Sequence, residues 1–213
     1  MLRISHDPPG EADLLCLGPL TNLAAAVDRD PTALQRFRSV TIIGGMGAAD
    51  RRGEVAATLP TFLAKGDTNT NYDPVAAARV ASAPGPVTWV GMDVTGRLQM
   101  PWTESGELAG TTKIARFVHA ITADYHMYCT STYDVDHPIY TSHDGVAAAV
   151  MLDPAVILAS EEATGVVEWS ADGRASWWGL SPGGTQSAAV HRVVTEIDYE
   201  AVRTRINRTL AGF

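Results

Sequence analysis

The sequence predicts an α/β fold, with a mostly parallel sheet flanked by helices. Short apolar or β-branched runs that end in glycine or proline are typical of buried strands. Alanine-rich stretches with helical spacing alternate with these runs, which is the order that produces a parallel sheet covered by helices. The chain has 213 residues, of which 46% are hydrophobic. This length is enough for one domain with a buried core.

The first 43 residues supply two strands with two helices between them. A strand is expected over 14–17, where the apolar run LLCL is followed by glycine and proline. A helix over 20–27 stops before Pro31, and a shorter helix is expected over 32–37. The β-branched run 39–43 predicts the second strand.

A long irregular stretch follows, from 46 to about 70. Loops of this length inside compact domains are usually functional or disordered. Asp73 and Pro74 open the next helix over 75–83, since proline is favoured in a first helical turn. Residues 86–91 then form the third expected strand.

The second half is more helical and ends in a β-rich tail. The spacing of apolar residues predicts the elements in this half. The expected helices are 103–109, 112–128, 142–152 and 198–210, and the expected strands are 166–169, 176–180 and 186–194.

Composition excludes several classes of protein. The formal net charge is -8 and no Lys/Arg cluster is present, which argues against nucleic-acid binding. No apolar stretch is long enough for a signal peptide or a membrane span. The two cysteines, Cys16 and Cys129, join no metal-binding pattern. We therefore expect a cytoplasmic protein with neither nucleic acid nor membrane as partner.

His143 and Asp144 are the first candidate functional residues. Ser142 is a favourable N-cap, so both fall in the first turn of the helix 142–152. Free backbone N–H groups and the positive end of the helix dipole lie there. An imidazole beside a carboxylate can hold a ligand or a metal. The alternative is an acidic residue that only stabilises the helix start.

Asp67 and Asn69 are the second candidates. In an extended backbone, residues two apart point the same way. A carboxylate and an amide on one face suit sugar hydroxyls, because one accepts hydrogen bonds and the other both donates and accepts. The alternative is turn chemistry, in which these residue types are common.

Five segments in this order resemble the inosine-uridine-preferring nucleoside hydrolase family. They are LCLGPLTNLA at 15–24, IIGGM at 42–46, DTNTNYDP at 67–74, VGMDVT at 90–95 and HD at 143–144. The resemblance implies hydrolysis of the N-glycosidic bond of purine or pyrimidine ribonucleosides, giving base and ribose for salvage. It also implies a Ca²⁺ ion at the site and a homo-oligomer.

The family's functional residues carry over to seven positions of this sequence. Asp144 matches a carboxylate ligand of the metal, and Leu17 matches a position whose main-chain carbonyl binds it. His143 matches the histidine often assigned as the acid that protonates the departing base. Four further positions are expected to bind substrate: Asp67, Asn69, Ile43 and Glu54. Asp67 and Asn69 would contact ribose hydroxyls, Ile43 would lie under the sugar, and Glu54 stands where the family usually has asparagine.

One family motif is absent. The family opens with Asp-x-Asp-x-x-x-Asp-Asp, which supplies most of the metal carboxylates, and this sequence has no such motif. We therefore expect residues 1–213 to form one domain that is truncated at its N-terminus and lacks the N-terminal strands. Ca²⁺ should bind weakly, because it needs six to eight oxygen ligands.

Two functions stay open on the sequence. The first is a nucleoside hydrolase with weak or no activity in this chain. The second is a non-catalytic nucleoside- or ribose-binding or interaction module derived from the family. A truncated chain, a degenerate family member and a half that pairs with another chain are the competing explanations.

Overall fold

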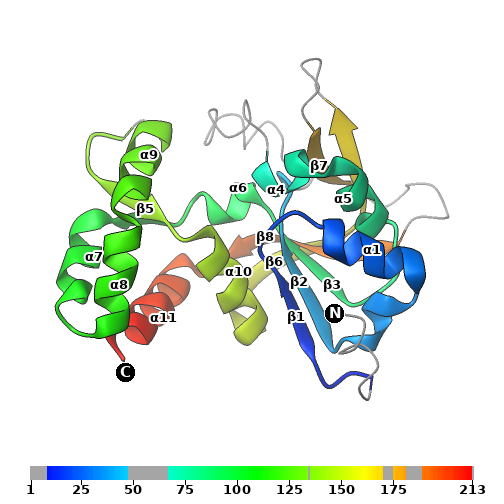
Figure 1. Cartoon of the computed structure of the whole chain (residues 1–213), viewed down its shortest axis with the longest axis horizontal. Helices are drawn as coiled ribbons and strands as arrows, with labels where there is room; N and C mark the ends of the chain where they lie inside the picture. Colours follow the sequence, from blue (N-terminus) through cyan, green and yellow to red (C-terminus); the bar gives the residue numbers. More distant parts are fainter. Residues whose placement is uncertain (1–8, 48–66, 134, 170–174, 181–188, 213) are drawn as a thin grey trace.

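A six-stranded sheet forms the centre of the described part of the chain (Figure 1). The computed structural model describes residues 9–47, 67–133, 135–169, 175–180 and 189–212, with backbone alone at 166–169 and 175–180. The strand order is β1-β2-β3-β8-β6-β7. The strands are β1 (Asp13–Cys16), β2 (Ser39–Ile43), β3 (Val87–Val90), β8 (Val190–Ile197), β6 (Ile157–Trp169) and β7 (Ala175–Leu180).

Four neighbouring strands of this sheet are parallel. β1 pairs with β2, β2 with β3 and β3 with β8, all in parallel register. β6 and β7 extend the sheet in antiparallel register. The predicted mostly parallel sheet is confirmed. Because β1, β2 and β3 are parallel and in register, their carboxyl ends meet at one edge of the sheet.

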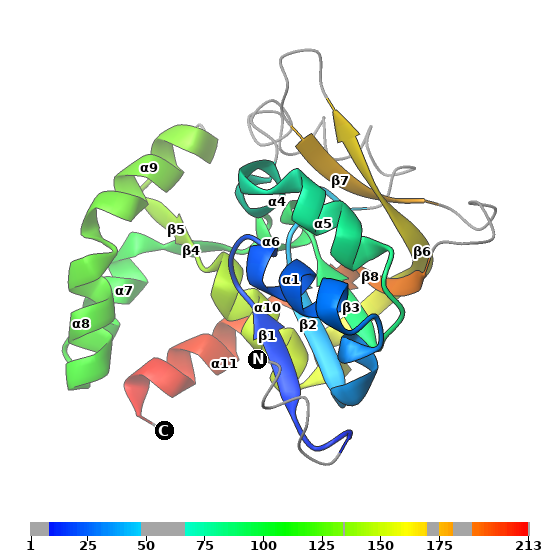
Figure 2. The same cartoon turned by 45° about the vertical axis from the view of Figure 1, so that its right-hand side comes forward.

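Helices cover both faces of the sheet. The helices and 3₁₀ turns that pack on it are α1 (Thr21–Arg29), η2 (Ala33–Arg36), α4 (Thr68–Tyr72), α5 (Pro74–Ala81), α6 (Met92–Thr95), α10 (His143–Leu152), η4 (Pro154–Val156) and α11 (Tyr199–Ala211). Figure 2 shows α1 and α5 together on one face and α10 on the other. Alternate residues of β3 feed the two cores, since Trp89 packs with α1 and α5 while Val90 packs with α10.

A smaller helical group lies beside the sheet, at the left of Figure 1. It consists of α7 (Trp102–Ala109), α8 (Lys113–Ile121) and α9 (Ala123–Tyr133), with a two-stranded antiparallel sheet of β4 (Gln99–Pro101) and β5 (Ile139–Thr141). The sequence did not predict β4 and β5. The ring of Trp102 is stacked between His119 and His126, with centroid separations of 4.3 and 4.2 Å. This ring stacking connects α7 to α8 and α9.

Several predicted boundaries are wrong. The helix expected over 112–128 is two helices, α8 and α9, which break at Thr122. The Thr122 hydroxyl donates to the Val118 carbonyl at 2.7 Å and so competes with the helical pattern. The helix expected over 32–37 is the single 3₁₀ turn η2. β6 begins at Ile157, nine residues before the predicted strand at 166, and β8 runs on to Ile197.

None of the helices among the described residues is both long and apolar enough to cross a bilayer.

A buried histidine should make folding stability depend on pH. The Trp89 indole donates to Nδ1 of His191 at 2.9 Å, so Nε2 of His191 carries the proton and donates to the Ala83 carbonyl at 2.9 Å. Burial lowers the pKa of His191 below 6.5. Between the two pKa values the unfolded chain therefore binds more protons than the folded one. Stability should fall as the pH drops below about 6.5, by up to about 1.4 kcal/mol for each pH unit.

The variant His191→Gln should weaken this pH dependence. It should also cost about 1–3 kcal/mol at pH 7, because buried hydrogen bonds are lost. Urea unfolding followed by tryptophan fluorescence at several pH values measures both effects. His137→Gln is the matched control, since the His137 side chain is 60% exposed. Identical pH slopes for the native chain and His191→Gln would contradict the prediction.

Candidate functional site

The candidate site lies where the parallel strands end. Leu17 follows β1, and by register it stands next to Ile43 at the end of β2. The end of β3 is next along the sheet, with α6 immediately after it. Figures 1 and 2 both show α4 and α6 side by side at this end of the sheet. In open α/β sheets ligands bind at the carboxyl ends of the strands.

Asp67 is the N-cap of α4, so Asn69 stands in a helical turn and not in the extended backbone in which the two side chains would point the same way. Oδ2 of Asp67 accepts from the Thr70 N–H at 2.6 Å, and its Oδ1 accepts from the Asn69 N–H at 3.3 Å. Burial raises the pKa of Asp67, against the hydrogen bonds from Thr70, Gly45 and Asn69. The turn chemistry weighed as an alternative is therefore present here. The direct ribose contact expected of Asp67 stays a prediction.

Asn69 connects α4 to the end of β2. Its side-chain nitrogen donates to the Ile43 carbonyl at 3.0 Å. Among the described residues its side-chain oxygen has no hydrogen-bond donor, and the residue is half-buried. Asn69 is thus held in place by one end of its amide, while the carbonyl end remains available to a hydroxyl group. Ile43 itself is buried.

Asp93 is a buried carboxylate that the sequence did not mark as a candidate. It is fully buried in α6, against the backbone of Gly47 and Gly91. A Cβ atom built on Gly47 would lie 2.2 Å from Oδ2 of Asp93. The Met92 N–H also donates to the Gly45 carbonyl at 2.9 Å. These contacts join the segment after β2 to the turn after β3.

His143 is held by two threonine hydroxyls. Its Nδ1 lies 2.8 Å from Oγ1 of Thr95 in α6, and its Nε2 lies 3.0 Å from Oγ1 of Thr141 in β5. The Thr141 hydroxyl is also 3.3 Å from the Tyr125 hydroxyl of α9. Burial lowers the pKa of His143 to about 4. The imidazole is therefore neutral at pH 7.

The sequence did not reveal the threonines that hold His143. Thr141 stands two residues before His143, and Thr95 closes the VGMDVT segment, but neither position has a pattern of its own. Ser142 occupies the N-cap position as predicted, but it makes no side-chain capping hydrogen bond. The cap geometry is unfavourable because the Ser142 backbone has φ −106° and ψ 69°.

Asp144 lies in the first turn of α10, where it is exposed. Its carboxyl is still partly shielded from solvent, and this desolvation raises its pKa. Within the described residues, no group of three or more His, Cys, Asp or Glu side chains could hold a metal. Oxygen from Asp144 and from the Leu17 backbone suits Ca²⁺ in kind, but two oxygens do not suit it in number. Glu54 lies outside the described residues.

Comparison with protein families gives a match over almost the whole chain. The family model "Inosine-uridine preferring nucleoside hydrolase" matches residues 1–204. A relative from Leishmania major, named inosine-uridine preferring nucleoside hydrolase, is 32% identical over 158 residues, which are 73% of this chain and 46% of that protein. The probable uridine nucleosidase 2 of Arabidopsis thaliana is 29% identical over 153 residues, which are 71% of this chain and 41% of that protein. The chain thus spans less than half the length of these relatives.

Solved structures share the fold. The purine-preferring ribonucleoside hydrolase from Gardnerella vaginalis aligns with a TM-score of 0.80 and 21% identity, covering 99% of this chain and 64% of that chain. The plant nucleoside hydrolase PpNRh1 aligns with a TM-score of 0.78 and 24% identity, covering 100% of this chain and 65% of that chain. At these identities the likeness speaks to the fold alone.

Proposed function

The chain belongs to the inosine-uridine preferring nucleoside hydrolase family, and we propose that it binds ribonucleosides and hydrolyses their N-glycosidic bond. The observation that supports this most directly is the hydrogen-bonded attachment of His143 to Thr95 in α6, the helix that follows β3. It brings the start of α10 to the same sheet edge as Ile43 and Asn69. A proton donor and a hydroxyl acceptor therefore share one edge of the sheet.

In the proposed reaction, a water oxygen forms a bond to C1′ of the ribose as the C1′–N bond breaks. The electron pair of that bond goes to the base, and the proton that the base needs comes from the charged, doubly protonated form of His143, which becomes neutral. The carbonyl oxygen of Asn69 accepts a ribose hydroxyl. The carboxylate of Asp144 stabilises the positive charge that develops on the sugar. A water proton finally restores the proton of His143, so the products are the free base and ribose.

For the metal, we propose that Asp144 and the Leu17 carbonyl are two of the oxygens that would contact Ca²⁺. Two oxygens are far fewer than the six to eight that Ca²⁺ takes. The described residues therefore do not form a complete calcium site, and no step of the proposed reaction depends on the ion. We expect weak Ca²⁺ binding, with a Kd of about 1 mM or higher, as in sites with few charged ligands.

The variant Asp144→Asn tests this assignment. It removes the negative charge but keeps the size of the side chain, so Ca²⁺ affinity should fall at least about tenfold. Calorimetric titration with CaCl₂ measures the change. Asp153→Asn, at the other end of α10, is the matched control and should leave the titration unaltered. Equal Ca²⁺ affinity for the native chain and Asp144→Asn would exclude Asp144 as a ligand.

The activity itself is tested by incubating the chain with inosine or uridine, with and without CaCl₂. We expect slow release of ribose, detected as reducing sugar, together with the free base. A folded sample that releases no ribose would overturn the catalytic proposal.

The second candidate function, a nucleoside- or ribose-binding module, is favoured by the lack of a metal-holding cluster among the described residues. Calorimetric binding of ribose without turnover would support that candidate.

A further inference from the structure

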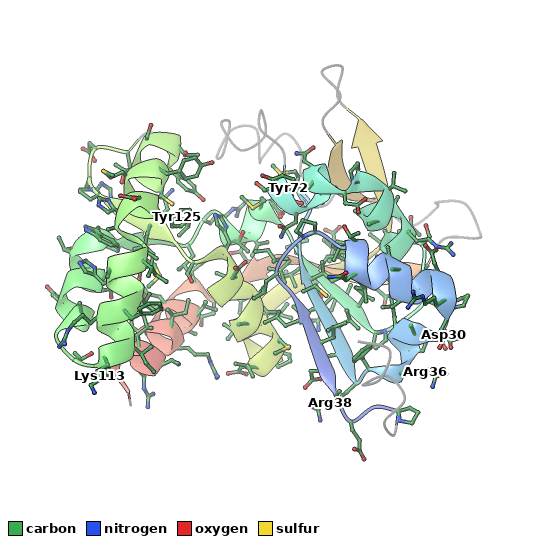
Figure 3. All side chains as sticks on the ribbon, viewed as in Figure 1. Asp30, Arg36, Arg38, Tyr72, Lys113 and Tyr125 are labelled. Atoms are coloured by element: carbon green, nitrogen blue, oxygen red, sulfur yellow. The ribbon has the colours of Figure 1, made fainter. Side chains whose placement is uncertain are left out.

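A cavity of about 390 Å³ lies at the end of the sheet opposite to the candidate site, and its volume is in the range of small-molecule sites. Residues near the starts of β2, β3 and β8 line it on one side, and the C-terminal end of α10 lines it on the other. Figure 3 shows both ends of the sheet, with Arg38, just before β2, at the lower end and Tyr72 of α4 at the upper end. We call this space the strand-start cavity.

A row of polar side chains crosses the sheet inside this cavity. Thr41 of β2 stands beside Thr88 of β3, and Thr88 stands beside Arg192 of β8. Arg192 stands in turn beside Glu162 of β6. Side chains at paired positions point to the same face of a sheet, and Val90, two residues after Thr88, packs with α10. The row therefore lies on the face that α10 covers, and all four of its residues line the cavity.

The two charged residues of the row stand side by side, yet no ion pair joins them in the part of the chain that the structure describes. Nε of Arg192 donates to the Ser160 hydroxyl at 2.9 Å, which turns the guanidinium along β6. The terminal nitrogens of Arg192 and the carboxylate of Glu162 have no hydrogen-bond partner among the described residues. Paired N–H donors and a carboxylate acceptor are thus available next to each other.

The remaining lining combines a buried hydroxyl with an apolar roof. Thr41 is 2% exposed, and its hydroxyl makes no hydrogen bond to another described residue. A buried hydroxyl without a partner loses free energy that a ligand or a water molecule can restore. Val150 and Met151 of α10, together with Pro154, cover the cavity with apolar groups. The cavity therefore offers two charges, free hydroxyls and an apolar surface to one small molecule.

We propose that the strand-start cavity binds a free α-amino acid with an apolar side chain. The ligand carboxylate accepts from the terminal N–H groups of Arg192 and from the Thr88 hydroxyl, an arrangement in which guanidinium groups bind carboxylates strongly. The ligand ammonium donates to Glu162 on the next strand. The ligand side chain packs under Val150 and Met151. This inference does not depend on the proposed hydrolase function.

The charges of the lining favour a zwitterion over a phosphate ester. Among the described residues that line the cavity, Arg192 is the cation and Glu162 is the anion. His191 also lines it but is neutral at pH 7, because burial lowers its pKa. A phosphate dianion bound to Arg192 would lie about 5 Å from Glu162, the spacing of neighbouring strands, and would be repelled. An amino acid places an opposite charge against each residue.

Calorimetric titration with L-leucine at pH 7 tests the proposal, and two analogues separate its charges. We expect a Kd of about 0.1–1 mM for L-leucine, as for a small ligand held by a few polar contacts. L-Leucinamide lacks the carboxylate and isocaproate lacks the ammonium, so each should bind at least about tenfold more weakly. A native chain that binds no L-leucine at about 10 mM would overturn the proposal. Binding of ribose phosphate in preference to L-leucine would overturn it as well.

Two variants test the assigned residues. Arg192→Gln and Glu162→Gln should each raise the Kd for L-leucine at least about tenfold, because each leaves one ligand charge unpaired. Both residues are exposed, so the fold should persist. Glu161→Gln is the matched control and should leave the Kd unaltered, since the preceding residue of a strand points to the opposite face. Isocaproate has no ammonium, so its affinity should not fall in Glu162→Gln. An unchanged L-leucine Kd in Arg192→Gln would contradict the proposal, as would equal losses in Glu161→Gln and Glu162→Gln.

Discussion

Replacement of His143 by alanine is expected to lower the rate of ribonucleoside hydrolysis by about 10²- to 10⁴-fold, the usual contribution of a positioned proton donor. The reason lies in the surroundings of the imidazole. Thr95 and Thr141 hold its two nitrogens, and burial lowers its pKa to about 4. The side chain is thus oriented by its neighbours, and its charged form, which is scarce at pH 7, is acidic enough to give up its proton readily.

The pH profile should separate proton donation from a purely structural role. If the charged form of His143 delivers the proton, the native rate should rise as the pH falls toward about 4, by up to about tenfold for each pH unit. The residual rate of His143→Ala should lack this limb. Initial rates with inosine between about pH 4.5 and pH 8 measure the effect. A variant with the native pH profile would exclude His143 as the proton donor.

Two controls keep this prediction testable. His143→Asn retains a polar group between the two threonines, so it should fold even if the alanine variant does not. His137→Ala changes an exposed histidine and should leave the rate unaltered. Circular dichroism of each variant at the assay pH establishes that only folded protein is compared.

The parallel part of the fold could be predicted because burial dictates the sequence pattern there. The strands β2 and β3 are buried on both faces, so nearly all their residues are β-branched or aromatic. Glycines mark the ends of both strands, and one of them, Gly91, packs closely against Asp93 and Gly47. Pattern alone does not predict pairing between distant short segments. β4 and β5 have three residues each and are brought together only by α7, α8 and α9.

The site could be predicted in part, because residue type and order indicate chemistry but not hydrogen-bond partners. His143, Asp144 and Asn69 stood out by type and position. The structure adds Thr95 and Thr141, whose hydroxyls act through contacts across 48 and 2 positions of sequence. For Asp67, residue type and spacing did not predict the local backbone conformation.

For residues 67–69, the structure has the turn chemistry weighed as the alternative to an extended backbone, because a short polar segment that begins with aspartate can cap a helical turn. The choice between the two conformations depends on contacts that the local sequence does not contain. The N–H of Gly45 also bonds Asp67, and Gly45 belongs to the segment after β2.

Gly47→Ala is expected to destabilise the protein by about 2–5 kcal/mol, through backbone strain and overpacking together. Gly47 has φ +90°, in the region that favours glycine, and an added Cβ would lie 2.2 Å from Oδ2 and 2.3 Å from Cγ of Asp93. Asp93 is fully buried and cannot turn aside without losing its place between Gly47 and Gly91. Urea unfolding measures the change, and Gly18→Ala is the matched control, because nothing lies within 4 Å of a Cβ at Gly18.

A double-mutant cycle shows whether Asp93 is the cause. If the clash with the carboxylate dominates, adding Asp93→Ala to Gly47→Ala should cost less than the sum of the two single changes, since the smaller side chain leaves room for the new methyl group. Strictly additive losses would instead assign the effect to the backbone conformation of Gly47 alone. Nucleoside affinity of the folded variants adds an independent readout. The segment after β2 also carries the Ile43 carbonyl that holds Asn69, so a displaced segment should weaken ribose binding while the fold persists.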